Sequence, residues 1–461
     1  MRRRVKDLVF YAPFRFSKEN FRQTATTEKN ISYIRFQFYD VFCYRMKNYL
    51  TDTLLCTLFV LGFLGLLYTI PGHFDLFKPL AHTLEDFEMT DIIYSRRTND
   101  DGSSYNLQDD YVPADTNVVL VNIGMLNREG IAAEINIINA HRPKLIAIDT
   151  VFERSSSPEA DRQLAGALSG VENLVLGRRL IGANEEKGGY DSLAPIYEPF
   201  YANAKVAYLN LNADNADAEG KYQVARSFVP KQRVADTTML SFAAQIAQIA
   251  YPKAYKRLLN RGQDHELINF RRTEYQYTVL DLQDIFNPEL AVSLKNKIVI
   301  MGYMGPSLGS QSWEVKYFTP LNEKYIGKTA PDMFEVTIHA NIVSMIHEGD
   351  YLNEMSKWLC ALIGVLLCML NVLVFLWVNR WLARWYDAIT KTIQFIEIIV
   401  LLYVVLLIFS HFRYKIDLTL GLTALLFAGD LLEIYVAVVK NIALVIKRRM
   451  RGEEPELNPE T

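Results

Sequence analysis

The stretch NVVLVNIGMLNREGIAAEINIINAHRPKLIAIDTVF, residues 117–152, decides the fold class of this protein. A β-branched apolar run of strand length comes first, followed by apolar residues at helical spacing and by a second apolar run, KLIAIDTVF. Farther along, SPEADRQLAGALSG predicts another helix and ENLVLGRRL predicts a third strand. Because strands that alternate with helices pair in parallel and carry the helices on their faces, we expect an α/β domain with a mostly parallel sheet flanked by helices.

Four apolar segments outside this domain are long enough to cross a membrane. One precedes the segment 71–357 and three follow it, namely residues 50–70, 358–378, 393–410 and 418–438. Lysine and arginine gather on the cytoplasmic side of membrane helices, and here they precede the first helix, separate the second from the third and follow the fourth. We therefore expect a multi-pass protein in the lipid bilayer, with the segment 71–357 extracytoplasmic.

The net charge of −3 conceals a strong asymmetry along the chain. The first fifty residues carry 11 basic against 4 acidic residues, which gives +7, whereas residues 71–357 carry 28 against 38, which gives −10. The basic segment 1–49 predicts an interfacial helix on anionic lipid, with protein docking as the alternative, and residues 439–461 predict a short basic cytoplasmic tail. The acidic middle segment argues against nucleic-acid binding, and its lack of cysteine excludes disulfides and thiolate metal sites there.

A series of short segments in a fixed order carries a family resemblance over about residues 80–350. In chain order these segments read LEDFEMTDIIYSRR, VVLVNIG, LIAIDTVF, DRQLAGAL, NLVLG, SFAAQIA, LINFR, KIVIMGYMG, YFTPL and VTIHANIVSMIHEG. The series resembles the type-two CHASE domain, an extracytoplasmic sensor module associated with bacterial cyclases and histidine kinases. The resemblance implies a bacterial inner-membrane location, one membrane helix before the domain and about three after it, and control of an effector from outside the cytoplasm.

Three departures from the family pattern bear on function. Family members commonly have an acid-Ile-Asp sequence after the first strand, where this chain has Asn122-Ile123-Gly124, and the chain has no Asp between KIVIMGYMG and TPL. The third and largest departure is the expected lack of an output domain after the last membrane helix, and with it we expect the signal to pass to a separate effector protein, in the cytoplasm or the membrane. Dimerisation is expected only from the resemblance to other membrane sensors.

A ligand site is predicted where the strands end, because ligands of doubly wound sheets bind at the carboxyl edge. Three such edges carry candidate ligand-binding residues, which are Asn122, Asp149 with Thr150, and Gly302 with Gly305. In the alternative interpretation, the glycines only permit a tight turn and Asp149 only caps the following segment. The ligand is predicted to be a small molecule of unknown identity.

The sequence gives little support for a metal site or for catalytic residues. His339 in TIHANI is interpreted as a satisfied core histidine, and the HEGD sequence at 347–350 has no partner ligands at metal-binding spacing. His-Glu-x-x-His and Ser-x-x-Lys constellations are missing, and the one Gly-x-Ser-x-Gly spacing, Gly305-Pro306-Ser307-Leu308-Gly309, lies in the glycine-rich loop after the KIVIMGYMG strand. We therefore predict no catalytic residues, no metal and no cofactor, and expect that the protein is not an enzyme.

Four polar residues within the membrane segments form a further candidate cluster. They are Asn371, Glu397, Asp430 and Glu433. Polar groups in lipid usually face a partner, and Asp430 and Glu433 are three residues apart and share one helical face. We expect the four to face one another or a partner helix, although Glu397 and Glu433 could also reach water at the interface.

Two functions agree with these observations. The first is a membrane sensor or input subunit that detects a ligand or an envelope contact and signals to a partner protein. The second is a structural scaffold or accessory subunit of an envelope complex, which the altered Asn122-Ile123-Gly124 sequence and the expected lack of an output domain favour.

Overall fold

The computed structural model describes residues 49–67, 113–184, 188–214, 224–287, 292–310, 312, 314–322, 330–439, 441–442 and 446. The chain divides into two compact units, a helical one and an α/β domain, and each is described by itself. The helical unit contains Lys357–Val400 and the segment from Asp417 onward, and residues Leu401–Ile416 belong to the α/β unit. The interfacial helix expected within residues 1–49 and almost all of the predicted tail lie outside the described residues.

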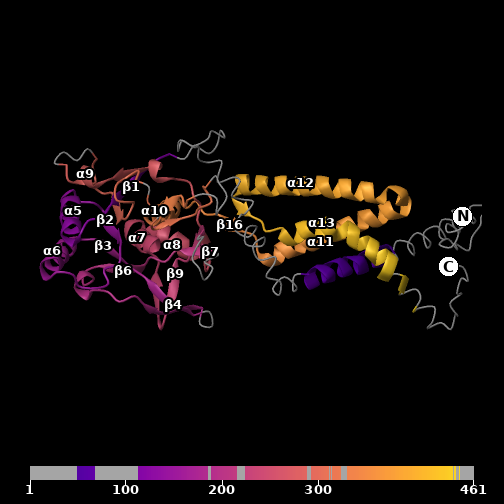
Figure 1. Cartoon of the computed structure of the whole chain (residues 1–461), viewed down its shortest axis with the longest axis horizontal. Coiled ribbons are helices and arrows are strands. Elements are labelled where there is room, and N and C mark those ends of the chain that lie inside the picture. The colour runs from indigo at the N-terminus through magenta and orange to yellow at the C-terminus, as the bar shows by residue number, and fades with distance from the viewer. Residues whose placement is uncertain are drawn as a thin grey trace, which may run out of the picture. The chain divides into compact units, whose positions relative to one another are not determined.

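The α/β domain is built on one parallel sheet (Figure 1). Among the described residues this sheet has six strands in the order β12-β1-β13-β2-β3-β6, and every neighbouring pair is parallel. The strands are β1 (Asp115–Asn122), β2 (Leu145–Asp149), β3 (Leu174–Arg178), β6 (Lys205–Tyr208), β12 (Tyr277–Leu280) and β13 (Ile298–Gly302). This architecture confirms the α/β fold class that the alternation of strands and helices predicts.

Helices cover both faces of the sheet (Figure 1). Side chains alternate between the faces along each strand, so Val119 and Val121 of β1 pack with one helical layer and Val118 and Leu120 with the other. The first layer contains α5 (Arg128–Ala140) and α6 (Pro158–Ser169). The second contains α7 (Phe242–Ala250), α8 (Pro252–Arg261) and α10 (Glu335–Glu348). Because both faces are buried, the strands read as continuous apolar runs in the sequence.

The chain order produces a switch in direction at the middle of the sheet. From β1 the chain passes to β2, β3 and β6, then returns to β12 at the other edge and finally inserts β13 between β1 and β2. The carboxyl ends of β1, β13 and β2 therefore lie next to each other, where crevices form in open parallel sheets.

Smaller elements complete the α/β domain. An antiparallel hairpin of β4 (Leu180–Asn184) and β5 (Gly189–Leu193) pairs with that of β9 (Lys231–Val234) and β10 (Thr237–Leu240). A second small sheet contains β7 (Asn212–Asp214), β8 (Val224–Phe228) and β11 (Glu266–Leu267). The short helix α9 (Leu282–Ile285) follows β12, and β14 (Lys316–Tyr317) pairs with β15 (Met333–Phe334) directly before α10.

The turn 413–416 also belongs to the α/β unit. Within it, β17 (Tyr414–Lys415) pairs in parallel with β16 (Asn353–Glu354), which follows α10. Phe409, from the last turn of the preceding helix, is 3% exposed and belongs to the same apolar core as α10. The end of that helix is therefore part of the packed structure of this domain.

Among the described residues, four helices are long and apolar enough to cross a membrane. They are Tyr49–Leu67, α11 (Lys357–Trp381), the segment Ala383–Phe412 that contains α12 (Tyr386–Phe412), and Thr419–Val439, which combines α13 (Thr419–Ile434) with a π-helical turn. One precedes the α/β domain in the chain and three follow it. The protein is therefore a multi-pass membrane protein, as the apolar segments predict.

Packing within the helical unit relies on small residues. Gly364 of α11 faces Gly421 of α13, and a Cβ at Gly364 would come within 3.2 Å of the Gly421 backbone nitrogen. Cys56 and Val60 of the first helix are fully buried in the same cluster as Val372 of α11. Close approach at small residues is the usual way in which membrane helices associate.

Candidate functional site

Three of the predicted ligand residues meet at the carboxyl edge of the sheet. Asn122 ends β1 and lies in register with Gly302 at the end of β13, and Gly302 lies in register with Asp149 at the end of β2. The insertion of β13 between β1 and β2 brings these ends together, and no local feature of the sequence specifies that insertion. The structure thus places the predicted residues side by side, although their roles differ.

Asn122 is fully engaged in holding the edge together. The described residues give its buried amide four hydrogen bonds, which use both amide hydrogens and the carbonyl oxygen twice. Its Nδ2 donates to Asp281 Oδ1 at 3.0 Å and to the Gly305 carbonyl at 3.1 Å, and its Oδ1 accepts from the backbone nitrogens of Gly124 and Met304 at 3.0 and 2.8 Å. Because an amide has no further hydrogen-bonding capacity, Asn122 acts as a structural clamp.

The two predicted glycines provide space and backbone freedom. Gly305 has φ +98°, a conformation that L side chains rarely adopt, and its carbonyl accepts from Asn122. At Gly302 a Cβ would lie 3.1 Å from the Val336 Cβ and 3.3 Å from the Asp149 Cβ. Gly302 therefore allows the first turn of α10 to approach the end of β2. Thr150 donates its hydroxyl to the adjacent Asp149 carbonyl at 2.7 Å.

That approach creates a cluster of three potential ligands. Asp149 lies at the end of β2, and Glu335 and His339 lie one turn apart at the beginning of α10. One oxygen or nitrogen atom from each residue lies within 4.8 Å of the atoms from the other two, which is a grouping that could hold a metal ion. Glu335 and His339 are 6% and 2% exposed, whereas Asp149 is partly exposed. We call these three residues the edge triad.

Burial dominates the electrostatics of the edge triad. It raises the pKa of Asp149 to about 7 and the pKa of Glu335 well above its usual value, to which the neighbouring Asp149 also contributes. The exposed Arg179 opposes both shifts through its positive charge. Burial lowers the pKa of His339 to about 3, so its imidazole is neutral. The triad therefore offers a neutral nitrogen, a buried carboxyl group at Glu335 and a partly exposed carboxyl group at Asp149.

His339 corrects one sequence-based interpretation. It is buried, as predicted, in contact with Phe242 at a ring-centroid distance of 5.0 Å. It is not satisfied, however, since within the described part of the chain neither ring nitrogen has a hydrogen-bond partner. Its approach to Glu335, with Nε2 and Oε1 4.0 Å apart, is too long for a hydrogen bond. The sequence contained one signal for this pair, because residues four apart share a helical face.

The family comparison agrees with this fold. The CHASE2 domain model matches residues 108–378. The chain belongs to the CHASE2 family. This assignment confirms the resemblance to type-two CHASE domains, and the match includes all three residues of the edge triad. Searches of the curated proteins and of the solved structures found no match.

Ion pairs gather at the other end of α10 in the CHASE2 domain. Arg272 pairs with Glu348 at 2.6 Å, and Arg271 pairs with both Glu348 and Asp350. Asp350, only 6% exposed, also pairs with Arg413 from the turn after α12. The HEGD sequence thus supplies Glu348 and Asp350 to ion pairs. Arg413 reaches Asp350 from a turn more than sixty residues later in the chain.

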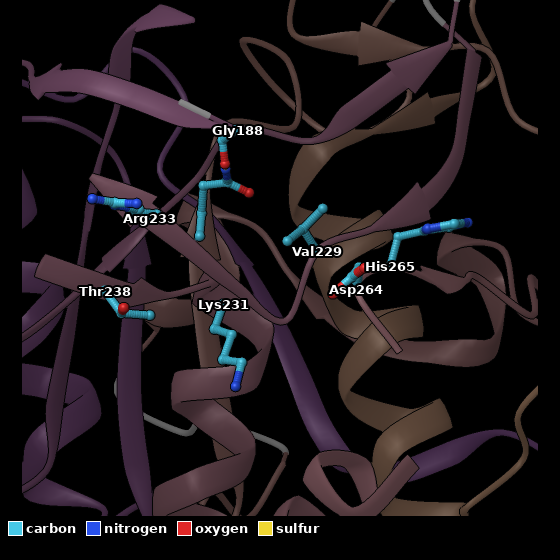
Figure 2. Close-up of a pocket in the computed structure, with 8 residues that line it drawn as sticks. Gly188, Val229, Lys231, Arg233, Thr238, Asp264 and His265 are labelled. Carbon is cyan, nitrogen blue, oxygen red and sulfur yellow. The ribbon is translucent and has the colours of Figure 1, made fainter. Parts of the chain in front are cut away.

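A separate open groove of about 520 Å³ lies on the small sheets outside the parallel sheet (Figure 2). Its lining residues are Gly188, Val229, Lys231, Gln232, Arg233, Thr238, Asp264 and His265. Figure 2 shows the Lys231, Arg233 and His265 side chains pointing in different directions. Since these groups do not converge on one point, the groove is a weaker candidate than the edge triad.

One of the four predicted polar residues of the membrane helices forms an ion pair within the helical unit. Lys391 of α12 donates to both carboxylate oxygens of Asp430 in α13 at 2.6 and 2.7 Å. Asn371 donates its Nδ2 to the Leu367 carbonyl at 3.3 Å, and among the described residues Asn371 Oδ1 and Glu397 Oε2 have no hydrogen-bond partner. Of the four predicted residues, only Asp430 therefore has a charged partner among the ion pairs of the described residues. The sequence analysis did not identify Lys391 as the partner of Asp430.

Proposed function

We propose that the protein is a non-enzymatic sensor subunit of the bacterial inner membrane, with its CHASE2 domain outside the cytoplasm. The domain detects a ligand at the edge triad, and the membrane helices pass the change to an effector protein in the cytoplasm or the membrane. Membership of the CHASE2 family supports the sensor role, and the basic residues that flank the membrane helices support the orientation.

The observation that carries this proposal is the position of α10. Its first two turns hold Glu335 and His339 of the edge triad, and its last turn holds Glu348 in the ion-pair group. Fourteen residues span about 21 Å at 1.5 Å per residue. Every residue from Glu335 to Ile346 is buried, so the helix moves as a packed rod and not as a flexible linker.

Two contacts connect the end of this rod to the segment between α12 and α13. The first is the ion pair of Asp350 with Arg413, and the second is the parallel pairing of β16 with β17. A ligand can shift an equilibrium only through different affinities for two states. We propose that the two states differ in the position of α10. Ligand binding at the beginning of α10 then shifts its other end, and the two contacts pass this shift to the turn between α12 and α13.

The proposed orientation has a direct test with a cysteine at an exposed position. Met125, 75% exposed beside the sheet edge, is a suitable site. Met125→Cys should react with a membrane-impermeant maleimide in cells whose outer membrane has been permeabilised, to an extent at least tenfold above the unsubstituted protein. Labelling that requires rupture of the inner membrane would place the domain in the cytoplasm and contradict the proposal.

The signalling role is tested by identifying the effector and then removing the ion pair between Asp350 and Arg413. Crosslinking in cells, purification of the full-length protein in mild detergent and mass spectrometry should identify a signalling enzyme. In reconstituted vesicles, Arg413→Glu should reduce the response of that enzyme to the sensor at least tenfold, because the substitution sets two acids against each other at Asp350. Capture of the effector should be unchanged.

The matched control is Arg162→Glu, which reverses one charge on the exposed face of α6, where Arg162 pairs with Glu159 at 3.0 Å. It should leave the response unchanged, because exposed pairs contribute little. If Arg413→Glu behaves like the control, α10 does not transmit the signal. If only envelope machinery is captured, and its association does not change with conditions, the scaffold function that the saturated Asn122 favours would replace the sensor.

A further inference from the structure

We propose that the edge triad of Asp149, Glu335 and His339 binds one divalent transition-metal ion with zinc-like coordination. The role of this ion as the detected ligand rests on the sensor function proposed above, whereas the binding itself does not. The sequence analysis predicted no metal. The ligands proposed here come from two segments of the chain 186 residues apart, so they form no motif that the sequence alone could reveal.

The donor set identifies the class of ion. One imidazole nitrogen and two carboxylate oxygens are the ligands that zinc and neighbouring divalent metals accept, commonly with a fourth position left for water. Calcium and magnesium prefer oxygen ligands alone, so the histidine argues against them. Thiolates cannot contribute, since segment 71–357 has no cysteine.

Burial supplies the second, independent observation. Within the described residues, the His339 ring nitrogens have no hydrogen-bond partner although the side chain is 2% exposed. A buried polar group without a partner is costly, and so is a carboxylate such as that of Glu335. A cation between them would give the imidazole a partner and would stabilise the ionised form of the neighbouring carboxyl groups.

The geometry leaves room for the ion and gives it a mechanical effect. Ligand atoms around a tetrahedral ion with bonds of about 2.0–2.1 Å stand roughly 3.3 Å apart. The triad atoms lie within 4.8 Å of one another, so an ion would draw them together by up to about 1.5 Å. Gly302 permits this movement, because it has no side chain between Asp149 and Val336.

The direction of this movement connects the ion to α10. Asp149 is fixed at the end of β2, in the middle of the parallel sheet, whereas Glu335 and His339 belong to the first two turns of α10. Closure around the ion therefore pulls the beginning of α10 toward the sheet edge. Because the helix is packed along its length, the shift reaches Glu348 and Asp350 at its other end.

The first test measures metal on the unsubstituted protein. Tag-free, full-length protein in detergent is stripped with a chelator, dialysed and titrated with Zn²⁺, with uptake measured by mass spectrometry of the metal. We expect one equivalent of Zn²⁺ and a rise of several degrees in melting temperature at saturation. X-ray absorption of the bound zinc should show one imidazole nitrogen and oxygen ligands. Sulfur ligation by the membrane-helix cysteines, or uptake below one equivalent, would overturn the site.

The second test uses substitutions that preserve size. Asp149→Asn, Glu335→Gln and His339→Gln should each weaken Zn²⁺ binding at least 100-fold and abolish the visible absorption of bound Co²⁺. The matched control is His347→Gln, which removes a histidine from the same helix, where it stacks on Tyr251 at 3.8 Å. This control should retain full affinity. Equal affinity in the control and the triad variants would contradict the assignment.

The binding test and the signalling test fail separately. Zinc uptake is measured without an effector, so its failure removes the metal site and leaves the membrane sensor proposal standing. Conversely, uptake with triad ligands together with an effector that ignores Zn²⁺ would confirm the site and exclude it as the signal input. A tenfold or larger change of effector output on Zn²⁺ addition, lost in Glu335→Gln, would establish both.

Discussion

Glu134→Gln should stabilise the α/β domain against unfolding at pH 8 by about 4 kcal/mol, and by less than about 1 kcal/mol at pH 5. Glu134 faces the core from α5 and is 0% exposed, and among the described residues neither of its carboxyl oxygens has a hydrogen-bond partner. Burial, with a smaller contribution from the charge of Asp281, raises the pKa of Glu134 from 4.5 to about 8.

The direction of this pH dependence follows from the number of protons that the folded and unfolded states bind. Between pH 4.5 and pH 8 the unfolded chain releases the Glu134 proton while the folded domain retains it. The stability of the natural protein therefore falls as the pH rises through this range, and above the folded pKa the loss is complete. Glutamine does not ionise, so the variant keeps its stability. Denaturant unfolding at several pH values, followed through the transition of the α/β domain, measures the difference.

The matched control is Glu129→Gln in the first turn of the same helix, where the side chain is exposed. It should leave the pH profile of stability parallel to that of the natural protein. Glu134→Met should stabilise at least as much as Glu134→Gln at pH 8, because it also removes the buried polar group. A stability difference between Glu134→Gln and the natural protein that does not change with pH would mean that Glu134 is not buried as a neutral acid.

The second large effect is expected at Asn122. Asn122→Ala should destabilise the α/β domain by about 4 kcal/mol, which lowers its melting temperature by roughly 10 °C. The substitution leaves the backbone nitrogens of Gly124 and Met304 and the carboxylate of Asp281 without their buried partner. Each such loss costs about 1–3 kcal/mol. Asn173→Ala is the control, since Asn173 is exposed and donates one hydrogen bond to the Lys144 carbonyl.

Exchanging the side chains of Asn122 and Asp281 distinguishes the loss of their hydrogen bond from a general loss of packing. Asn122→Asp alone should be at least as harmful as alanine at neutral pH, because it sets a second carboxylate about 3 Å from Asp281. Combined with Asp281→Asn, it should recover about half of the lost stability, since one donor and one acceptor again face each other. No recovery in the double variant would show that Asp281 is not the partner that makes the asparagine necessary.

This pairing gives a physical interpretation of a departure from the family pattern. The sequence analysis noted Asn122 where family members commonly carry an acid, and treated it as support for a scaffold. The structure places Asp281 directly opposite, with its Oδ2 also accepting from the Leu308 nitrogen at 2.9 Å. A neutral donor at position 122 matches that acid. The departure is therefore compatible with an intact sheet edge.

The sequence determined the features that depend on local periodicity. Apolar runs of strand length such as VVLV at 118–121 and LIAI at 145–148 predict buried strands, and the helical spacing between them predicts parallel pairing. The apolar segments around Val372 and Leu425 were predicted as membrane helices from their length and composition. Such patterns persist in any arrangement of the elements, so they could be interpreted without the tertiary structure.

Only the tertiary structure decided which side chains meet. The insertion of β13 between β1 and β2, with Gly302 at its end, brings the first turn of α10 against Asp149. His339 lies in an apolar helical sequence typical of a core position, so its unpaired nitrogens could not be inferred from its neighbours in the chain. Likewise, Asp350 meets Arg413 because β16 and β17 pair. Periodicity fixes which face of an element is buried, whereas contacts between distant elements depend on strand order and on the space that single residues leave.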